Sequence, residues 1–128
     1  MKKSLFIIVP LLAATVAESG CSHLKMGLFM FNSNPGESDS DSVARGEEAF
    51  LKNCVSCHGK NADGKGEEAG YLTATPTNFR NPEYLKKPVR IAAHIAYGKG
   101  SEMPAFDGKI PYETIWDMAN YLHTLQKN

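Results

Sequence analysis

The chain has 128 residues, and 14 Lys and Arg balance 14 Asp and Glu, so its formal net charge is zero. This balance excludes strong long-range steering of partners by net charge, and the chain has no basic stripe suited to nucleic acid.

The first element has the pattern of an export signal. Lys2 and Lys3 precede an uncharged apolar run at residues 4–17. A membrane-spanning helix needs about 20 apolar residues, so this shorter run matches the apolar core of a secretory signal peptide. We expect residues 1–20 to be a signal peptide and the mature protein to be periplasmic. A retained membrane anchor is the alternative, which the length disfavours.

Cys21 ends a stretch that resembles a lipoprotein signal. Ser19-Gly20-Cys21 is similar to the end of a lipobox, in which the cysteine receives lipid. Glu18 departs from that pattern, and cleavage after Ala17 is the alternative, which would leave Cys21 as a spare thiol. A spare thiol is a liability in an oxidising compartment. We therefore expect lipidation of Cys21 and a membrane tether.

Residues 21–42 are expected to link the leader to the folded part. Residues 24–31 are apolar and lie either on the membrane surface or on the folded domain. Residues 32–42 consist of Asn, Ser, Pro, Gly and acids. They bury too little apolar surface to offset the entropy of ordering, so we expect a flexible linker.

The folded domain is expected to span residues 43–128 and to be all-α, since no stretch alternates with the period of a strand. Its first helix is predicted for residues 43–54. Asp41 or Ser42 is expected to cap this helix. The apolar side of the helix is predicted to hold Ala44, Ala49, Phe50 and Leu51.

The strongest chemical signal of the chain is Cys54-Val55-Ser56-Cys57-His58. Two thiols three positions apart, followed directly by an imidazole, are typical of covalent haem c attachment. Each cysteine forms a thioether with the haem, and His58 binds the iron from the proximal side. A redox-active cysteine pair and half of a zinc site are the alternatives. Cys21 is the only other cysteine in the chain, so no second pair completes a zinc site.

One such motif predicts one haem per chain. A domain of this size buries little apolar surface for a stable fold, and covalently bound haem would add the missing stabilisation. A glycine-rich loop follows the motif at residues 59–70. Helix starts are predicted at Asn81-Pro82-Glu83 and at Pro88, and the second of these helices is predicted to end at Gly98.

The distal iron ligand is expected to be Met103. It lies between Gly100 and Pro104, so it belongs to a tight loop that can cross the open haem face opposite His58. A buried methionine that fills a gap in the core is the alternative. A thioether ligand raises the potential of the iron relative to a second histidine.

The last helix is predicted from Pro111 to about Lys127. Its apolar positions follow helical spacing: Ile115, Met118, Ala119, Leu122 and Leu125. Met118 therefore belongs to the core. His94 and His123 lie on helices and are expected to be surface or core residues.

Together these motifs resemble small bacterial class I cytochromes c, over essentially the whole domain. Gly46 and Phe50 are similar to the helix that leads into the haem motif, and Tyr121 and Leu122 to the C-terminal helix that crosses it at Gly46. Gly98 and residues 103–106 resemble the distal ligand loop.

Residues 71–79 resemble the proximal segment of that family. The resemblance implies that the carbonyl group of Pro76 accepts the Nδ1 proton of His58. The fold it implies is the class I cytochrome c fold, with helices and loops around one haem.

Electron transfer is the expected function. With His58 and Met103 on both sides of the iron, no position is open to a substrate, which favours a carrier over an enzyme. Its partners would be redox proteins, a donor and an acceptor. The alternatives are a haem-based gas sensor, in which Met103 leaves the iron, and a haem subunit of a larger oxidoreductase.

Overall fold

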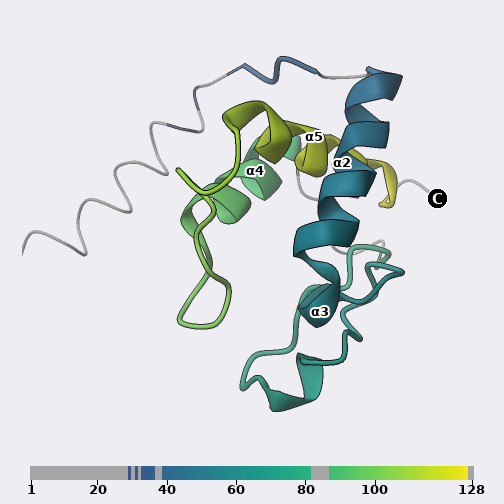
Figure 1. The fold of residues 1–128 in the computed structure, drawn as a ribbon, viewed down its shortest axis with the longest axis vertical. Helices are drawn as coiled ribbons and strands as arrows, with labels where there is room; N and C mark the ends of the chain where they lie inside the picture. The colour runs from purple at the N-terminus through teal and green to yellow at the C-terminus, as the bar shows by residue number, and fades with distance from the viewer. Residues whose placement is uncertain (1–28, 30, 32, 37–38, 82–86, 127–128) are drawn as a thin grey trace, which may run out of the picture.

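A computed structural model describes residues 29, 31, 33–36, 39–81 and 87–126. Four α-helices and one 3-10 turn follow one another in this part of the chain (Figure 1): α2 (Ser40–Asn53), α3 (Val55–His58), η1 (Ala69–Tyr71), α4 (Pro88–Tyr97) and α5 (Tyr112–Thr124). The described residues form no strand, and their one β feature is an isolated bridge between Lys99 and Met103. The expected all-α class is confirmed. The signal peptide, Cys21 and the helix expected at Asn81-Pro82-Glu83 lie outside the described residues, apart from Asn81 itself.

Helix α2 begins earlier than expected, and its cap is Asp39. The Asp39 side chain accepts a hydrogen bond of 3.0 Å from the backbone N–H of Asp41. The prediction of Asp41 or Ser42 as the cap was wrong, because Asp41 lies in the first turn and the Ser42 hydroxyl is buried in a contact with another helix.

The buried face of α2 also differs from the expected one. Its buried residues are Ser42, Gly46 and Phe50, which recur every fourth position and so share one face. Ala44 and Leu51 are exposed. The helix therefore presents small residues, rather than a fully apolar stripe, to its neighbour.

That neighbour is α5, which crosses behind α2 (Figure 1). A Cβ atom placed on Gly46 would lie 2.0 Å from the carbonyl oxygen of Asp117, far inside any normal contact. Only glycine permits this approach, so the expected role of Gly46 at the helix crossing is confirmed.

Helix α4 packs on the same helix, α5, and completes the core. It runs from Pro88 to Tyr97 and is capped by Gly98, whose φ of 75° lies in the left-handed region that favours glycine. The predicted apolar positions of α5 are all buried: Ile115, Met118, Ala119, Leu122 and Leu125. Helix α5 ends at Thr124, before the predicted boundary, with Leu125 as its cap residue.

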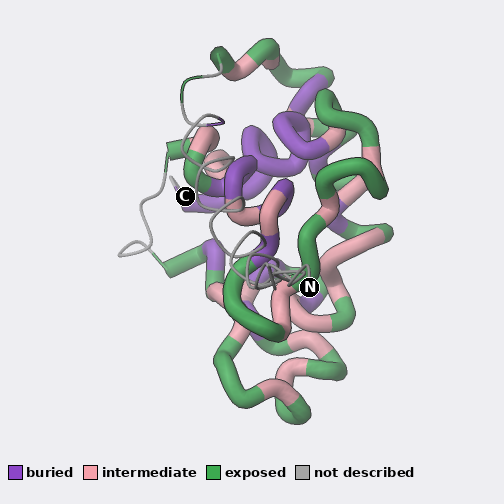
Figure 2. Tube along the Cα trace, turned by 90° about the vertical axis from the view of Figure 1, so that its left-hand side faces the viewer, coloured by how far each residue is buried: buried purple, intermediate pink, exposed green. Residues whose placement is uncertain are grey.

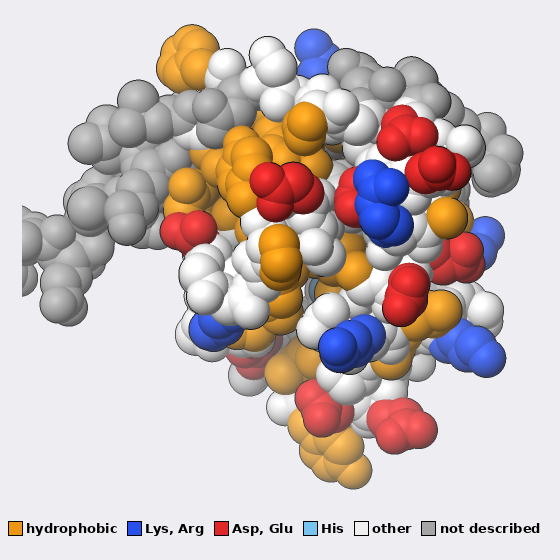
Figure 3. Space-filling view, turned by 45° about the horizontal axis from the view of Figure 1, so that its top comes forward, with side chains coloured by type: hydrophobic (Ala, Val, Ile, Leu, Met, Phe, Trp, Pro, Cys, Tyr) orange, Lys and Arg blue, Asp and Glu red, His pale blue; other side chains and the backbone are white. Residues whose placement is uncertain are grey.

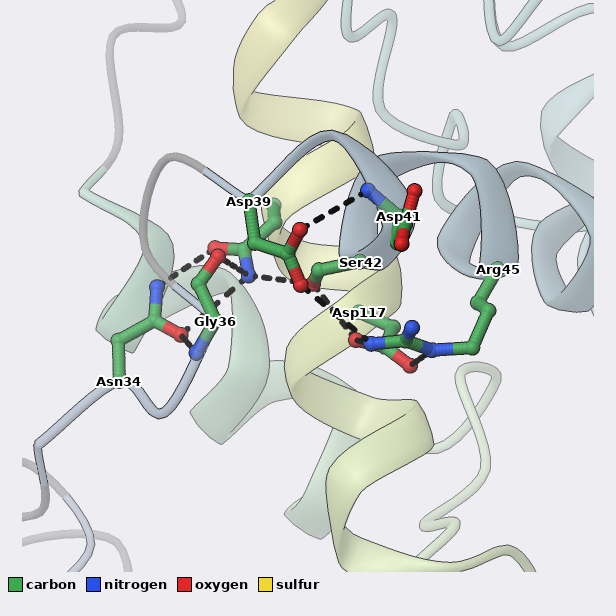
Figure 4. A network of polar contacts seen from close by, with 8 residues as sticks. Asn34, Gly36, Asp39, Asp41, Ser42, Arg45 and Asp117 are labelled. Atoms are coloured by element: carbon green, nitrogen blue, oxygen red, sulfur yellow. Dashed lines mark hydrogen bonds and ion pairs between the residues drawn. The ribbon is translucent and has the colours of Figure 1, made fainter.

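A network of polar side chains joins α2 to α5 at their crossing (Figure 4). The buried Asp117 carboxylate accepts a hydrogen bond of 2.6 Å from the Ser42 hydroxyl. Arg45 donates to both carboxylate oxygens of Asp117, at 2.8 Å and 3.1 Å. A buried carboxylate is costly unless it is paired and hydrogen-bonded, and this one is both.

The network also reaches part of the segment expected to be a flexible linker. Asn34 donates to the side-chain oxygen of Asn120 at 2.6 Å, and Asn120 donates to the carbonyl oxygen of Gly36 at 3.0 Å. A Cβ atom on Gly36 would lie 2.7 Å from the Ser42 hydroxyl oxygen. Residues 34–36 therefore lie against the helix crossing.

Phe29 also lies on the folded domain, one of the two locations open to the apolar segment. Its side chain is buried, and its ring stacks on that of Trp116. The rings of Tyr97 and Tyr112 meet it edge-on. Buried residues gather in the half of the molecule that holds α4 and α5 (Figure 2), whereas the loops after α3 are mostly exposed or half-buried.

Candidate haem site

The cysteine–histidine motif lies on α3, directly below α2 (Figure 1). Cys54 is the residue at which α2 ends and α3 begins, so both cysteines and the histidine lie on one short helical turn. Cys54 and Cys57 are free thiols and are half-buried. Two free thiols on one turn, beside an imidazole, fit the attachment of haem by two thioether bonds.

The environment of Cys54 bears on the alternative of a redox-active cysteine pair. Burial, with a smaller contribution from Cys57, raises the pKa of the Cys54 thiol to about 12. A redox-active pair depends on a thiolate whose pKa is lowered. The surroundings of Cys54 therefore disfavour thiol–disulfide chemistry.

The ring of His58 is held in one orientation. Its Nδ1 atom lies 3.1 Å from the carbonyl oxygen of Thr77, and its ring lies 5.1 Å from that of Phe79. Burial lowers the pKa of His58, although the Thr77 contact opposes this effect. A neutral imidazole that donates from Nδ1 keeps the Nε2 lone pair for a metal, which is the arrangement iron needs.

The acceptor for this proton differs from the one that the resemblance implies. The carbonyl group belongs to Thr77, not to Pro76. The Pro76 carbonyl oxygen points at Gly64 instead, since a Cβ atom on Gly64 would lie 2.5 Å from it. Pro76 still contributes to the proximal segment, one residue from the contact.

The glycine-rich loop folds back onto the motif. The backbone N–H groups of Gly64 and Gly66 donate to the carbonyl oxygens of His58 and Cys57, at 2.8 Å and 3.1 Å. A Cβ atom on Gly66 would lie 2.1 Å from the carbonyl oxygen of Ser56. The loop therefore needs glycine to cover the end of α3 so closely.

Met103 lies on a tight loop, as expected from its neighbours. Lys99 and Met103 exchange backbone hydrogen bonds of 3.1 Å and 3.4 Å, which close the loop. A Cβ atom on Gly98 would lie 2.5 Å from the carbonyl oxygen of Met103. The Met103 side chain is half-buried and packs against the core, as Cys54 does. Met118 is fully buried on α5, which confirms that it belongs to the core.

Glu102, directly before Met103, makes contacts that the sequence did not reveal. Its Oε1 atom accepts hydrogen bonds from the backbone N–H and the hydroxyl of Thr73, at 2.7 Å and 2.8 Å. Its Oε2 atom accepts one from the backbone N–H of Ala74 at 2.8 Å. These bonds, those from the Thr73 and Ala74 backbones first, lower the pKa of Glu102. The Met103 loop is thus tied to the proximal segment.

Residues 41–122 match the family described as "Cytochrome C oxidase, cbb3-type, subunit III". The chain belongs to this family. Covalently bound haem c with iron comes with this membership, and the class I cytochrome c resemblance is confirmed at the level of the c-type cytochrome domain. The expected electron-transfer function agrees with the family, as does the alternative of a haem subunit in a larger oxidoreductase.

Curated relatives of the family carry related names. A "Cbb3-type cytochrome c oxidase subunit FixP" of Bradyrhizobium diazoefficiens is 34% identical over 83 residues, covering 65% of this chain and 27% of the relative. A "Cbb3-type cytochrome c oxidase subunit CcoP" of Azospirillum brasilense is 29% identical over 97 residues, covering 76% of this chain and 33% of the relative. The chain thus spans about a third or less of these relatives.

A solved structure shares the fold. A chain of the "Kuenenia stuttgartiensis reducing HAO-like protein complex Kustc0457/Kustc0458" superposes with a TM-score of 0.60 at 20% identity, covering 67% of this chain and 44% of that one. This likeness supports the expected cytochrome c fold.

The surface around the fold carries charge of both signs. On the face shown in Figure 3, acidic and basic side chains alternate around an area of hydrophobic side chains. No large field of one sign forms on that face. Among the described residues, no helix combines the length and the apolar character that a membrane crossing requires.

Proposed function

We propose that the chain is a single-haem electron carrier whose iron is bound by His58 and Met103. Cys54 and Cys57 would hold the haem through thioether bonds. When bound, haem c supplies an iron that changes oxidation state by one electron. The chain's own part is to fix the ligands and to keep water and substrates from the metal.

The observation that carries this proposal is the contact between Nδ1 of His58 and the carbonyl oxygen of Thr77, at 3.1 Å. It favours the tautomer in which Nδ1 donates and Nε2 keeps its lone pair for a metal. It also lies beside two free thiols with the spacing of thioether attachment. The tight loop that carries Met103 offers a thioether for the other face of the iron.

With both axial positions filled, the chain would have no position for a substrate, so we treat it as a carrier without catalytic activity of its own. The apolar leader and Cys21 support export to the periplasm and a lipid tether. Redox proteins would then be its donor and its acceptor.

A second candidate function is that of a haem subunit in a larger oxidoreductase. It is favoured by the names of the relatives, which are subunits of cbb3-type oxidases. Extraction of the membranes with mild detergent separates the two functions. A free carrier elutes alone, whereas a subunit elutes with other redox proteins.

Two measurements on the purified holoprotein test the central proposal. The mass of the mature chain should exceed that of the polypeptide by one haem, and it also reports the cleavage point and any lipid on Cys21. The ferric form should show the weak absorption near the red end of the visible range that an iron–thioether bond produces. Absence of that absorption, or rapid binding of carbon monoxide by the ferrous form, would favour a gas sensor instead.

A further inference from the structure

Glu102 connects the loop that carries the proposed distal ligand to the segment that contacts the proposed proximal ligand. It directly precedes Met103. Its carboxylate reaches Thr73 and Ala74, a few residues before the carbonyl group of Thr77 that orients His58. One side chain therefore joins the loop of the proposed distal ligand to the segment behind the proximal ligand.

The contact is stronger than a single surface hydrogen bond. The carboxylate accepts from two consecutive backbone N–H groups and one hydroxyl, with all three distances between 2.7 Å and 2.8 Å. Hydrogen bonds to a charged acceptor are shorter and stronger than neutral ones. Because both oxygen atoms take part, the carboxylate fixes the direction as well as the distance between the two segments.

A loop that is held at one end has fewer conformations in which it can open. The two backbone hydrogen bonds between Lys99 and Met103 hold the ends of the loop of residues 99–103 together. The Glu102 carboxylate ties the same stretch to a segment 28 to 29 residues away in the sequence. Loss of that second tie would raise the entropy of the open state and favour departure of Met103.

We infer that Glu102 is a positioning residue that holds the Met103 loop against residues 73–77, and thereby keeps the haem iron closed to external ligands. The inference rests on the proposed ligation by Met103. It predicts a specific effect on ligand access, beyond any effect on stability.

The test measures imidazole binding to the ferric holoprotein and the red-end absorption of the same samples. Met103→Ala gives the fully open reference. Glu102→Ala should bind imidazole about tenfold more tightly than the unchanged protein, because several charge-assisted hydrogen bonds at a partly exposed site are lost. Glu102→Gln keeps an acceptor oxygen but loses the charge. Its affinity for imidazole should lie between those of Glu102→Ala and the unchanged protein.

Two further variants control for nonspecific effects. Glu67→Gln removes a carboxylate from an exposed loop position and should match the unchanged protein. Thr73→Ala removes only the hydroxyl donor and keeps both backbone donors, so its effect should be smaller than that of Glu102→Ala. Thermal unfolding of each variant separates general loosening from local opening.

The experiment distinguishes failure of the Glu102 role from failure of the proposed function. If Met103→Ala leaves imidazole affinity and the red-end absorption unchanged, Met103 is not the ligand, and both proposals fall. If Met103→Ala opens the iron while Glu102→Ala and Glu102→Gln bind imidazole as Glu67→Gln does, the carrier proposal stands and the role of Glu102 is wrong. Should Glu102→Ala fail to fold, Glu102→Gln alone decides, since it preserves shape.

Discussion

The ring of Phe29 stacks on that of Trp116, with centroids 5.4 Å apart and planes inclined by 13°. Phe29 precedes the first described helix, whereas Trp116 lies in the middle of the last. A residue from outside helices α2 to α5 thus completes the aromatic cluster between α4 and α5.

Phe29→Ala should therefore destabilise the domain by about 3 kcal/mol, the lower end of the range for truncation of a buried phenylalanine to alanine. Phe31→Ala is the matched control, since that side chain is 88% exposed, and it should have no measurable effect. Denaturant unfolding measures both. The single tryptophan of the chain adds a local readout: its indole N–H resonance should move in Phe29→Ala alone. Equal stability of the two variants would show that Phe29 contributes nothing.

Gly46→Ala should disrupt the crossing of α2 and α5. The added methyl group would lie 2.0 Å from the Asp117 carbonyl oxygen, so the two helix backbones must move apart. The cost should be about 2 kcal/mol or more, which exceeds the gain of about 1 kcal/mol from replacing glycine inside a helix. Gly70→Ala meets no atom within 4 Å and is the control. A Gly46→Ala protein as stable as its control would contradict the close approach.

Ser42→Ala should cost about 1–2 kcal/mol, because it removes the hydroxyl that donates to the buried Asp117 carboxylate and accepts from Asn120. Ser40→Ala, at an exposed position in the same helix, is the control. Chemical denaturation of the holoprotein gives the comparison. If both serine variants unfold at the same denaturant concentration, the Ser42 hydroxyl is not needed in the network.

Tyr121 should make stability fall at high pH. Burial, and secondarily Glu47, raises the pKa of Tyr121 above its usual value of 10.0. The unfolded chain therefore releases this proton first, so the contribution is complete below about pH 10 and is lost as the pH rises through the folded-state pKa. Over that range, the unfolding free energy of the unchanged protein should fall relative to that of Tyr121→Phe. Tyr71→Phe changes an exposed ring and should follow the unchanged protein throughout. A constant difference for Tyr121→Phe would overturn the assignment.

Much of the site could be predicted from local sequence. Haem attachment and ligation require the spacing of Cys54, Cys57 and His58, so the motif can be recognised from the sequence alone. Gly98 ends α4 because a left-handed backbone favours glycine, and that signal is also local. Gly46 was predicted through the family resemblance, which already contains the helix crossing.

Other features depend on contacts between distant segments. Asp39, Asp41 and Ser42 can all cap a helix, and the choice of Asp39 follows from the burial of Ser42 against Asp117. Thr77 rather than Pro76 faces His58 because the direction of a carbonyl group depends on loop torsions that sequence does not specify.

Glu102 was missed for the same reason. Its partners, Thr73 and Ala74, lie 29 and 28 residues away, and no periodicity links such positions. The linker contacts of Asn34 and Gly36 were also unexpected, because composition alone does not show that a polar segment has polar partners on α5.

The bond between Ser42 and Asp117 joins positions 75 residues apart, and it lies where the first and last described helices meet. Contacts of such long range are slow to form, because the entropy of closing the intervening chain must be overcome first. The two cysteines of the haem motif lie between these helices. Until α5 packs against α2, the haem motif would therefore belong to an open chain, and closure of this crossing would enclose it between the two helices.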